Sequence, residues 1–341
     1  MRVVLVLTER CSGALTVSLV EAMIMANYCH HKAGGDSPLF EWTLASVDGQ
    51  PVLPFNGLPL AADCALPEAL SNSPIPATEQ VWVVPSIIEA VSRPERIVQA
   101  LTRLQPVVTL VQSHYQRGGV VASACTGAFL LAEAGLLTPY PALMHWRSEA
   151  SFQQLFPGLR TDTRTALADY GRIVCATGGS QSAAQMVLHW VAKEHSEALA
   201  LEVAKLMQVD RHPTAPVAYA ATQADAPHND DKVRLAQARL RERLHQSISI
   251  DGLAAELAIS DRQLKRRFAQ ATGLSPLKYL QKERLKRACQ LLENSRLTSA
   301  RIAGEVGYQD ESNFRRLFKR ELGMTMEHYR RRFSPRISAA D

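Results

Sequence analysis

The sequence lacks the features of a membrane protein, a secreted protein or a disordered chain. Its most apolar long window, Val120–Leu137, still contains Glu133 and two glycines, so we expect no membrane span. The apolar run Val3–Leu7 is too short for the core of a signal peptide. Glycine and proline, at 18 each, are too few for a low-complexity chain. These absences predict a soluble cytoplasmic protein.

Cysteine is also scarce, and its spacing excludes several kinds of site. The six cysteines are scattered, none forms a C-x-x-C pair, and no Cys/His cluster has the spacing of a zinc site. A chain of this length does not depend on disulfide bonds, so we expect reduced thiols. We therefore expect no metal and no cofactor.

What the sequence does contain is enough apolar residues for packed cores, and an uneven distribution of charge. A length of 341 residues with 46% hydrophobic residues predicts two or three domains. Residues 1–227 hold 14 Lys and Arg and 19 Asp and Glu, a net charge of −5, whereas residues 228–341 hold 24 and 14, a net charge of +10. A basic C-terminal third favours a polyanion such as nucleic acid, although solvated helices are often basic as well.

Strand-like and helix-like segments alternate through the first two hundred residues. Strands are expected at 2–7, 40–47, 80–84, 120–124 and 172–176, and helices at 15–30, 94–116, 126–134 and 180–194. This alternation predicts a doubly wound α/β domain, a parallel sheet with helices on both faces. The segment 211–231 has three prolines and ends in an acidic pair, so we expect a linker there, mainly at 222–231. The expected domains are therefore 1–210 and 232–335, with a tail at 336–341.

An internal repeat organises the basic third. Leu253, Ala254 and Leu257 match Ile302, Ala303 and Val306 at an offset of 49, and Leu264, Phe268 and Gly273 match Phe314, Phe318 and Gly323 at an offset of 50. Each copy reads as a short helix, a tight turn and a second helix closed by glycine. We expect Asp251 and Ser299 to cap the first helices, and Ser260 and Asp310 to cap the second.

This pattern predicts an all-α domain with two helix-turn-helix units. One long helix, Pro276–Leu292, would hold the units at a fixed separation, and the second helix of each unit would enter a major groove. The expected DNA-facing residues lie opposite the buried positions: Arg262, Lys265 and Arg266 in the first unit, and Ser312, Asn313, Arg315 and Arg316 in the second. Glu311 either accepts a hydrogen bond from a cytosine amine or is an ordinary solvated residue.

Residues 234–335 resemble the DNA-binding domain of the AraC/XylS family of transcription regulators. The stretch IAGEVGYQDESNFRRLFKRELGMTMEHYRRRF carries most of the resemblance. The resemblance implies that double-stranded promoter DNA is the partner, and Arg316 is the residue that we most expect to contact a base edge or a phosphate. Met326 departs from the family pattern, which has proline there, and we expect it to alter the start of the last helix.

The stretch GGVVASACTGAFLLAEAGLL places a thiol at a strand-to-helix turn. The strand ends at Ala124, Cys125 follows, and the helix begins at once. The free N–H groups of a helix start favour a thiolate or bind an anionic ligand, so the turn fits either a nucleophile or a ligand pocket. A small buried cysteine with neither role is the third alternative.

Residues 2–195 resemble the DJ-1/PfpI superfamily, through ACTGAFLLAEAGLL, the pair His145 and Trp146, and the run 177–179. Together with the basic third, the whole chain resembles GlxA-type regulators, whose first domain is thought to sense a small molecule such as an amino acid or amine. The expected ligand-binding residues are Ser86, Cys125, Thr126, Gly127, His145, Trp146, Gly178 and Gly179. Trp146 would either form a cation–π contact with an amine or pack in the core.

The catalytic residues of that superfamily are incomplete in this sequence. PfpI-type peptidases place histidine after the nucleophile, where this chain has Thr126, and DJ-1-like proteins use an acidic residue where this chain has an apolar one near Leu15. Only His145 remains as a base for Cys125. We therefore expect a ligand-sensing regulator without catalytic residues. The alternatives are a hydrolase or glyoxalase that uses Cys125 and His145, and an architectural DNA-binding protein.

The regulator reading also predicts partners. We expect a homodimer formed through the helices at 180–195 and 197–207, whose apolar positions exceed what one side of a helix normally buries. A small-molecule effector would shift the arrangement of the two DNA-binding domains, and RNA polymerase is a further partner at the promoter. Such a protein would be associated with the nucleoid.

Overall fold

The computed structural model describes residues 1–341 except 72–74, 88–93, 179, 212–215, 221–227 and 335–341. The chain folds into two compact units, Met1–Pro216 and Val217–Asp341. Among the described residues, no helix is both long and apolar enough to cross a bilayer. Residues 221–227 of the expected linker and the expected tail at 336–341 lie outside the described residues.

The first unit is built on a seven-stranded sheet of order β3-β2-β1-β4-β5-β9-β8. Its strands are β1 (Arg2–Val6), β2 (Glu41–Ser46), β3 (Cys64–Ala65), β4 (Gln80–Val84), β5 (Val120–Ala124), β8 (Leu167–Asp169) and β9 (Ile173–Ala176). All neighbours pair in parallel except β8, which is antiparallel to β9. A separate parallel pair joins β6 (Ala142–Leu143) to β7 (Thr161–Asp162). The expected strands are present, and the unexpected ones are two or three residues long, too short to show a period.

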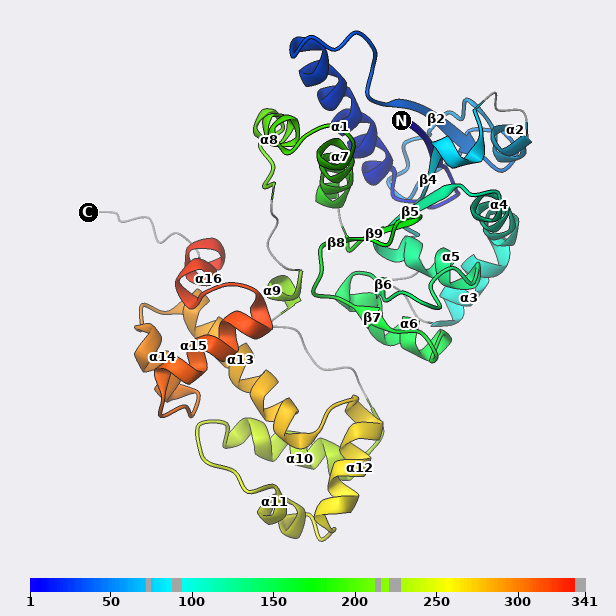
Figure 1. Cartoon of the computed structure of the whole chain (residues 1–341). Helices are drawn as coiled ribbons and strands as arrows, with labels where there is room; N and C mark the ends of the chain where they lie inside the picture. The colour runs from blue at the N-terminus through cyan, green and yellow to red at the C-terminus, as the bar shows by residue number, and fades with distance from the viewer. Residues whose placement is uncertain (72–74, 88–93, 179, 212–215, 221–227, 335–341) are drawn as a thin grey trace. The chain divides into compact units, whose positions relative to one another are not determined.

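Helices cover both faces of this sheet, which confirms the doubly wound α/β fold (Figure 1). One face carries α1 (Gly13–Lys32), α7 (Ser180–Glu194) and α8 (Glu197–Leu206); the other carries α2 (Leu66–Ser71), α3 (Pro94–Arg103), α4 (Gln105–Gln116), α5 (Ala128–Glu133) and α6 (Glu149–Leu155). Val3 and Leu5 of β1 join the core beneath α1 and α7. Val4 and Val6 join the core beneath α3, α4 and α5, because successive side chains of a strand point to opposite faces.

The helix expected over 94–116 is wrong in one respect, because it is two helices. The first, α3, ends at Arg103, and α4 begins at Gln105 after Leu104. Pro106 occupies the first turn of α4, where its missing N–H costs nothing, whereas inside a continuous helix it would remove a hydrogen bond. The proline therefore marks a helix start, as Pro94 does for α3.

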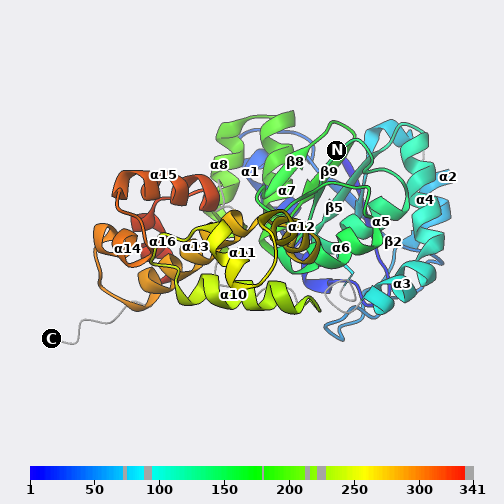
Figure 2. The same ribbon diagram turned by 90° about the horizontal axis from the view of Figure 1, so that it is seen from below.

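The second unit is helical throughout its described residues. Its helices are α9 (Val217–Ala220), α10 (Asp231–Glu242), α11 (Ile250–Glu256), α12 (Asp261–Thr272), α13 (Pro276–Asn294), α14 (Ser299–Glu305), α15 (Glu311–Leu322) and α16 (Met326–Phe333). Helices α10–α12 lie at one end of α13 and α14–α16 at the other (Figure 2). The helix α9 falls inside the segment expected to be a linker, and its Ala218 is buried in the core with α15 and α16.

The helix caps follow the repeat, with one correction. Ser260 forms a capping box with Gln263 at the start of α12, and Asp310 accepts backbone hydrogen bonds at the start of α15, as expected. The caps of α11 and α14 are Ser249 and Thr298, however, and not the predicted Asp251 and Ser299. An N-cap residue keeps an extended backbone, and Asp251 and Ser299 already lie within the first helical turn.

Met326 stands at the start of the last helix, where the expected effect of its departure from proline would be felt. It is the first residue of α16, and Thr325 caps the helix by accepting a hydrogen bond from the backbone N–H of His328. Proline is favoured at this same first position because its fixed φ suits a helix start. The helix start is thus formed with methionine at a position that proline also suits.

Candidate nucleic-acid interface and effector pocket

The second helix of the first helix-turn-helix unit, α12, has one buried and one exposed face. Leu264 and Phe268 are fully buried. The three expected DNA-facing residues, Arg262, Lys265 and Arg266, are exposed on the same helix. Lys265 Nζ lies 2.6 Å from Asp261 Oδ2, so the expected contact of Lys265 with a phosphate would have to replace this ion pair.

The corresponding helix α15 exposes all four expected residues, Ser312, Asn313, Arg315 and Arg316. Arg315 Nε lies 2.8 Å from Glu311 Oε1, and its Nη2 lies 3.3 Å from Glu327 Oε1. Two carboxylates therefore hold Arg315, and Glu311 is paired within its own helix. Arg316 donates to the neutral side-chain oxygen of Asn313. Arg316 is thus the less neutralised of the two arginines.

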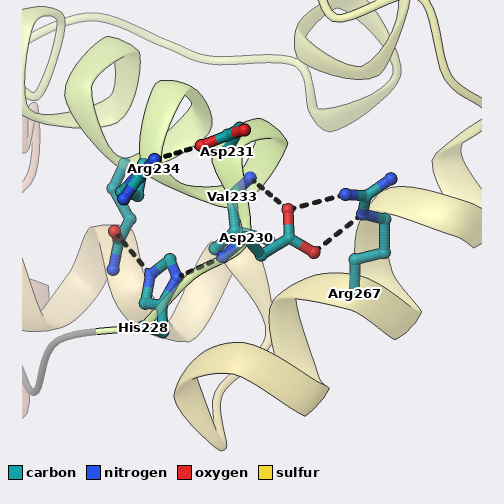
Figure 3. Close-up of polar contacts among 7 residues, drawn as sticks. His228, Asp230, Asp231, Val233, Arg234 and Arg267 are labelled. Atoms are coloured by element: carbon teal, nitrogen blue, oxygen red, sulfur yellow. Dashed lines mark hydrogen bonds and ion pairs between the residues drawn. The ribbon is translucent and has the colours of Figure 1, made fainter.

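A carboxylate that the sequence analysis did not single out links the start of α10 to α12 (Figure 3). Both oxygens of Asp230 accept from Arg267, at 2.8 Å from Nε and 2.9 Å from Nη2. Asp230 also caps α10 by accepting from the backbone N–H of Val233. The Arg267 hydrogen bonds are the main reason why the pKa of Asp230 is lowered from its ordinary value. An acidic residue just before a helical period is the sequence signal for such a cap.

Cys125 stands on a sharp turn at the carboxyl end of β5. Its φ is +53°, a left-handed conformation that is strained for any residue except glycine. A short 3-10 turn, η3 (Cys125–Gly127), follows and leads into α5. The thiol is half-buried. This is the strand-to-helix elbow expected from the sequence, with a side chain presented at the sheet edge.

Ser86, Thr126 and Gly127 lie behind this elbow. Ser86 Oγ lies 2.7 Å from Thr126 Oγ1, which donates to the carbonyl of Ile87, also at 2.7 Å. Both side chains are buried. A Cβ on Gly127 would stand 2.9 Å from the carbonyl oxygen of Pro85, so only glycine allows this close approach. These three residues brace the elbow against the end of β4 and have few free polar groups for a ligand.

Cys125, His145 and Gly178 converge at one point on the sheet edge. A Cβ built on Gly178 would stand 3.5 Å from His145 Cδ2 and 3.6 Å from Cys125 Sγ. The backbone N–H of Gly178 donates to Ser182 Oγ at 2.7 Å. Gly179 lies outside the described residues. The three converging residues come from segments after β5, β6 and β9, which places them together at the carboxyl edge of the two sheets.

The surroundings of His145 favour its neutral imidazole form. Burial, and secondly the neighbouring Arg147, lower its pKa from the ordinary value. Its Nδ1 accepts from the backbone N–H of Arg147 at 3.3 Å. Within the described part of the chain, no hydrogen bond or ion pair joins His145 to a carboxylate or to Cys125, and no group of three His, Cys, Asp or Glu residues could hold a metal.

Trp146 has neighbours on its ring already. The guanidinium carbon of Arg147 lies 5.6 Å from the centroid of the Trp146 ring, and the His145 ring lies 4.6 Å away. A side chain of the protein therefore already makes a cation–π contact with this ring.

Thr8 is a residue at this edge that sequence reasoning missed. It follows β1, and β1 and β4 are the strands between which the chain order reverses, where doubly wound folds bind ligands. Thr8 is 3% exposed, and its Oγ1 has no hydrogen-bond partner among the described residues. Nothing in the sequence near Thr8 distinguishes it; only the strand order does.

Comparison with known proteins shows what the chain is similar to. Residues 253–332 match a family model described as "Helix-turn-helix domain". The chain is 28% identical over 313 residues to the HTH-type transcriptional regulator GbdR of Pseudomonas aeruginosa. This alignment covers 90% of this chain and 78% of GbdR. It is 25% identical over 214 residues to the HTH-type transcriptional regulator GlxA of Rhizobium meliloti, with 62% and 65% covered.

Among solved structures, an AraC family transcriptional regulator from Pseudomonas putida has a TM-score of 0.47 at 24% identity, and covers 60% of this chain and 98% of that one. The family match spans both helix-turn-helix units, and the alignment with GbdR extends over both compact units of the chain. The chain is therefore a transcriptional regulator with a helix-turn-helix domain behind an α/β domain, and it is similar to the regulators GbdR and GlxA.

Proposed function

We propose that the first unit binds a small metabolite at the carboxyl edge of its sheet, and that binding changes how the regulator occupies promoter DNA. The observation that carries this proposal is the convergence of Cys125, His145 and Gly178 beside the elbow. A half-buried thiol and a neutral imidazole suit a small polar effector, and an amino acid or amine remains the class expected from the resemblance. The effector acts by binding one arrangement of the protein more tightly than the other.

We infer that Cys125 is a ligand contact and not a nucleophile. A cysteine hydrolase needs a base beside the thiol and a group that orients the base. His145 has its Nδ1 taken up by the Arg147 backbone, and no carboxylate partner is found for it among the described residues. Ser86 and Thr126 bond to each other and do not serve as orienting groups.

The homodimer stays part of this proposal, with a different surface. The apolar residues of α7 are buried in the core, so α7 does not offer the expected interface. Val17, Ile24 and Tyr28 of α1 are exposed at 45%, 42% and 49%, and α8 exposes Leu201 and Leu206. We propose that α1 and α8, which both cover the same face of the sheet, meet a second copy. The other proposed partners are promoter DNA and RNA polymerase. The proposed location is the cytoplasm, at the nucleoid.

A thermal-shift screen of the full chain against amino acids and alkylamines tests effector binding. A compound that raises the melting temperature should lose its effect in His145→Ala and keep it in His31→Ala, since His31 is exposed on α1, on the opposite face from the elbow's helix α5. If the effect is equal in both variants, the effector binds elsewhere.

Catalysis is tested separately with Cys125→Ala. We expect this variant to bind DNA as the wild-type chain does, and we expect no turnover of thioester or glyoxal substrates by either protein. Turnover by the wild-type chain that is abolished in Cys125→Ala would replace the proposal with the enzyme alternative.

A further inference from the structure

The two helix-turn-helix units have separate hydrophobic cores. One core lies beneath α10–α12 and the first half of α13, and includes Leu264 and Phe268. The other lies beneath the second half of α13 and α14–α16, and includes Phe314 and Phe318. Leu244, just after α10, packs against both cores. Apart from this residue, α13 is the element that the two cores share.

A cleft opens between the two helix-turn-helix units. It has a volume of about 730 Å³ and is lined by the end of α10, by one side of α13 and by α14. Arg241, Arg287 and Arg301 are among its lining residues. The two helix-turn-helix units are therefore not packed tightly along this side. Their relative orientation depends on contacts elsewhere.

Arg284 makes that contact. It lies on α13 and is half-buried. Its Nε donates to the carbonyl oxygen of Leu244 and its Nη2 donates to the carbonyl oxygen of Gln246, both at 2.7 Å. A guanidinium presents several donors in a rigid fork, so one side chain holds two carbonyls at once. Arg284 thus fixes the segment that runs from α10 to α11 in the first helix-turn-helix unit.

The same guanidinium also contacts the turn between α14 and α15, in the second helix-turn-helix unit. Its central carbon lies 5.2 Å from the ring centroid of Tyr308, and the Tyr308 ring lies 4.7 Å from that of Phe314 on α15. A Cβ on Gly307 would stand 2.9 Å from Arg284 Nη2 and 2.9 Å from the backbone of His245. Gly307 has a φ of +83°, so glycine is needed there both for its conformation and for its lack of a side chain.

We propose that Arg284 is a positioning residue that fixes the separation of α12 and α15, and so sets the spacing between the two DNA blocks that the protein reads. A two-unit reader must place its recognition helices about one helical turn of DNA apart. A single connecting helix bends and twists by small amounts, whereas a contact that joins the α10–α11 segment, α13 and the α14–α15 turn removes this freedom. The position is within the connector and not on either DNA-facing helix.

The test uses the full chain and an operator obtained by in vitro selection from random duplexes. Binding is measured for this operator and for duplexes with one base pair inserted or deleted between its two blocks. Wild-type binding should weaken about tenfold or more on the altered duplexes, as for a mismatched site. In Arg284→Gln we expect the operator to be favoured over the altered duplexes by about threefold or less, with binding to each single block unchanged.

The matched control is Arg287→Gln. Arg287 is exposed about one turn further along α13, and its Nη1 contacts Gln290 of the same helix, with no hydrogen bond to the α10–α11 segment among the described residues. This variant loses the same charge and should keep the wild-type spacing preference. Arg284→Lys is the second variant, since it keeps the charge and the stem but has no fork to hold both carbonyls. If circular dichroism shows that Arg284→Gln does not fold, the spacing preference is measured on Arg284→Lys instead. A folded Arg284 variant with the wild-type spacing preference would overturn the proposal.

Discussion

Asp230 and Arg267 form a two-pronged ion pair that ties the residue before α10 to the recognition helix α12, with oxygen-to-nitrogen distances of 2.8 and 2.9 Å (Figure 3). Asp230 is also the cap of α10. His228, the first described residue after 221–227, holds Asp230 in turn, because its Nδ1 lies 3.3 Å from the Asp230 backbone N–H. The residue before α10 is thereby anchored to α12, the helix expected to face DNA in the first helix-turn-helix unit.

Replacement of Asp230 by alanine should destabilise the second unit. The lost N-cap alone costs about 1 kcal/mol, and the lost ion pair with a half-exposed arginine adds a smaller amount because solvent screens it. Urea unfolding of the full chain, followed by the helical circular dichroism signal, measures this change. Asp231→Ala is the control, since Asp231 is exposed, caps no helix and has its ion pair with Arg234. Equal losses in the two variants would contradict the anchoring role.

The same residue predicts a dependence on pH. The pKa of Asp230 is lowered in the folded state from its ordinary value of 3.8. Its stabilising contribution is therefore complete above about pH 4 and is lost as the pH falls through the lower, folded-state pKa. The difference in free energy of unfolding between wild type and Asp230→Asn should shrink in that acid range. A difference that is constant from neutral pH to pH 3 would disprove this assignment.

Arg316→Ala should weaken binding to the selected operator by about 1–3 kcal/mol if Arg316 contacts a base edge. Arg315→Ala should have a smaller effect, because Glu311 and Glu327 already hold Arg315. Fluorescence anisotropy at a stated salt concentration measures both. Arg301→Ala, an exposed arginine of α14 paired with Glu305, serves as the control. An Arg316→Ala loss no larger than that of the control would show that this end of α15 does not face the DNA.

Ala258→Gly should stabilise the second unit. Ala258 lies in the turn between α11 and α12 with a φ of +52°, and it corresponds in the repeat to Gly307, whose φ is +83°. Glycine relieves the left-handed strain, which costs roughly 1–2 kcal/mol, but it loses more backbone entropy, so the net gain is about 0.5–1 kcal/mol. Ala258 is exposed, so no packing is lost. Urea unfolding measures the gain, and a destabilised variant would refute the strain argument.

Ile24→Glu should produce a monomer if α1 forms the dimer interface. Ile24 is 42% exposed, so a charge there costs the folded monomer little but disrupts an apolar contact between copies. Size-exclusion chromatography with light scattering measures the mass. Val98→Glu is the control, because Val98 is 46% exposed on α3, on the other face of the sheet. A Val98→Glu monomer, or a monomeric wild type, would exclude this interface.

The sequence by itself determined the local features of this protein. The alternation of strands and helices, the repeat of two helix-turn-helix units, the caps Ser260 and Asp310 and the elbow at Cys125 all follow from patterns within a few residues. Periodicity and capping act over one or two helical turns, so they are legible in the chain. The exposed faces of α12 and α15 are also predicted this way, since burial of one helix face leaves the other for DNA.

Only the tertiary structure decided which distant residues meet. It brought His145 and Gly178 to Cys125, and it turned the expected ligand residues Ser86 and Thr126 toward each other. It also placed Arg284 against the carbonyls of Leu244 and Gln246, forty and thirty-eight residues away in the chain. Such contacts depend on how whole elements pack, and no short-range pattern records them. A half-buried arginine therefore reads in the sequence as one more basic residue of a basic helix.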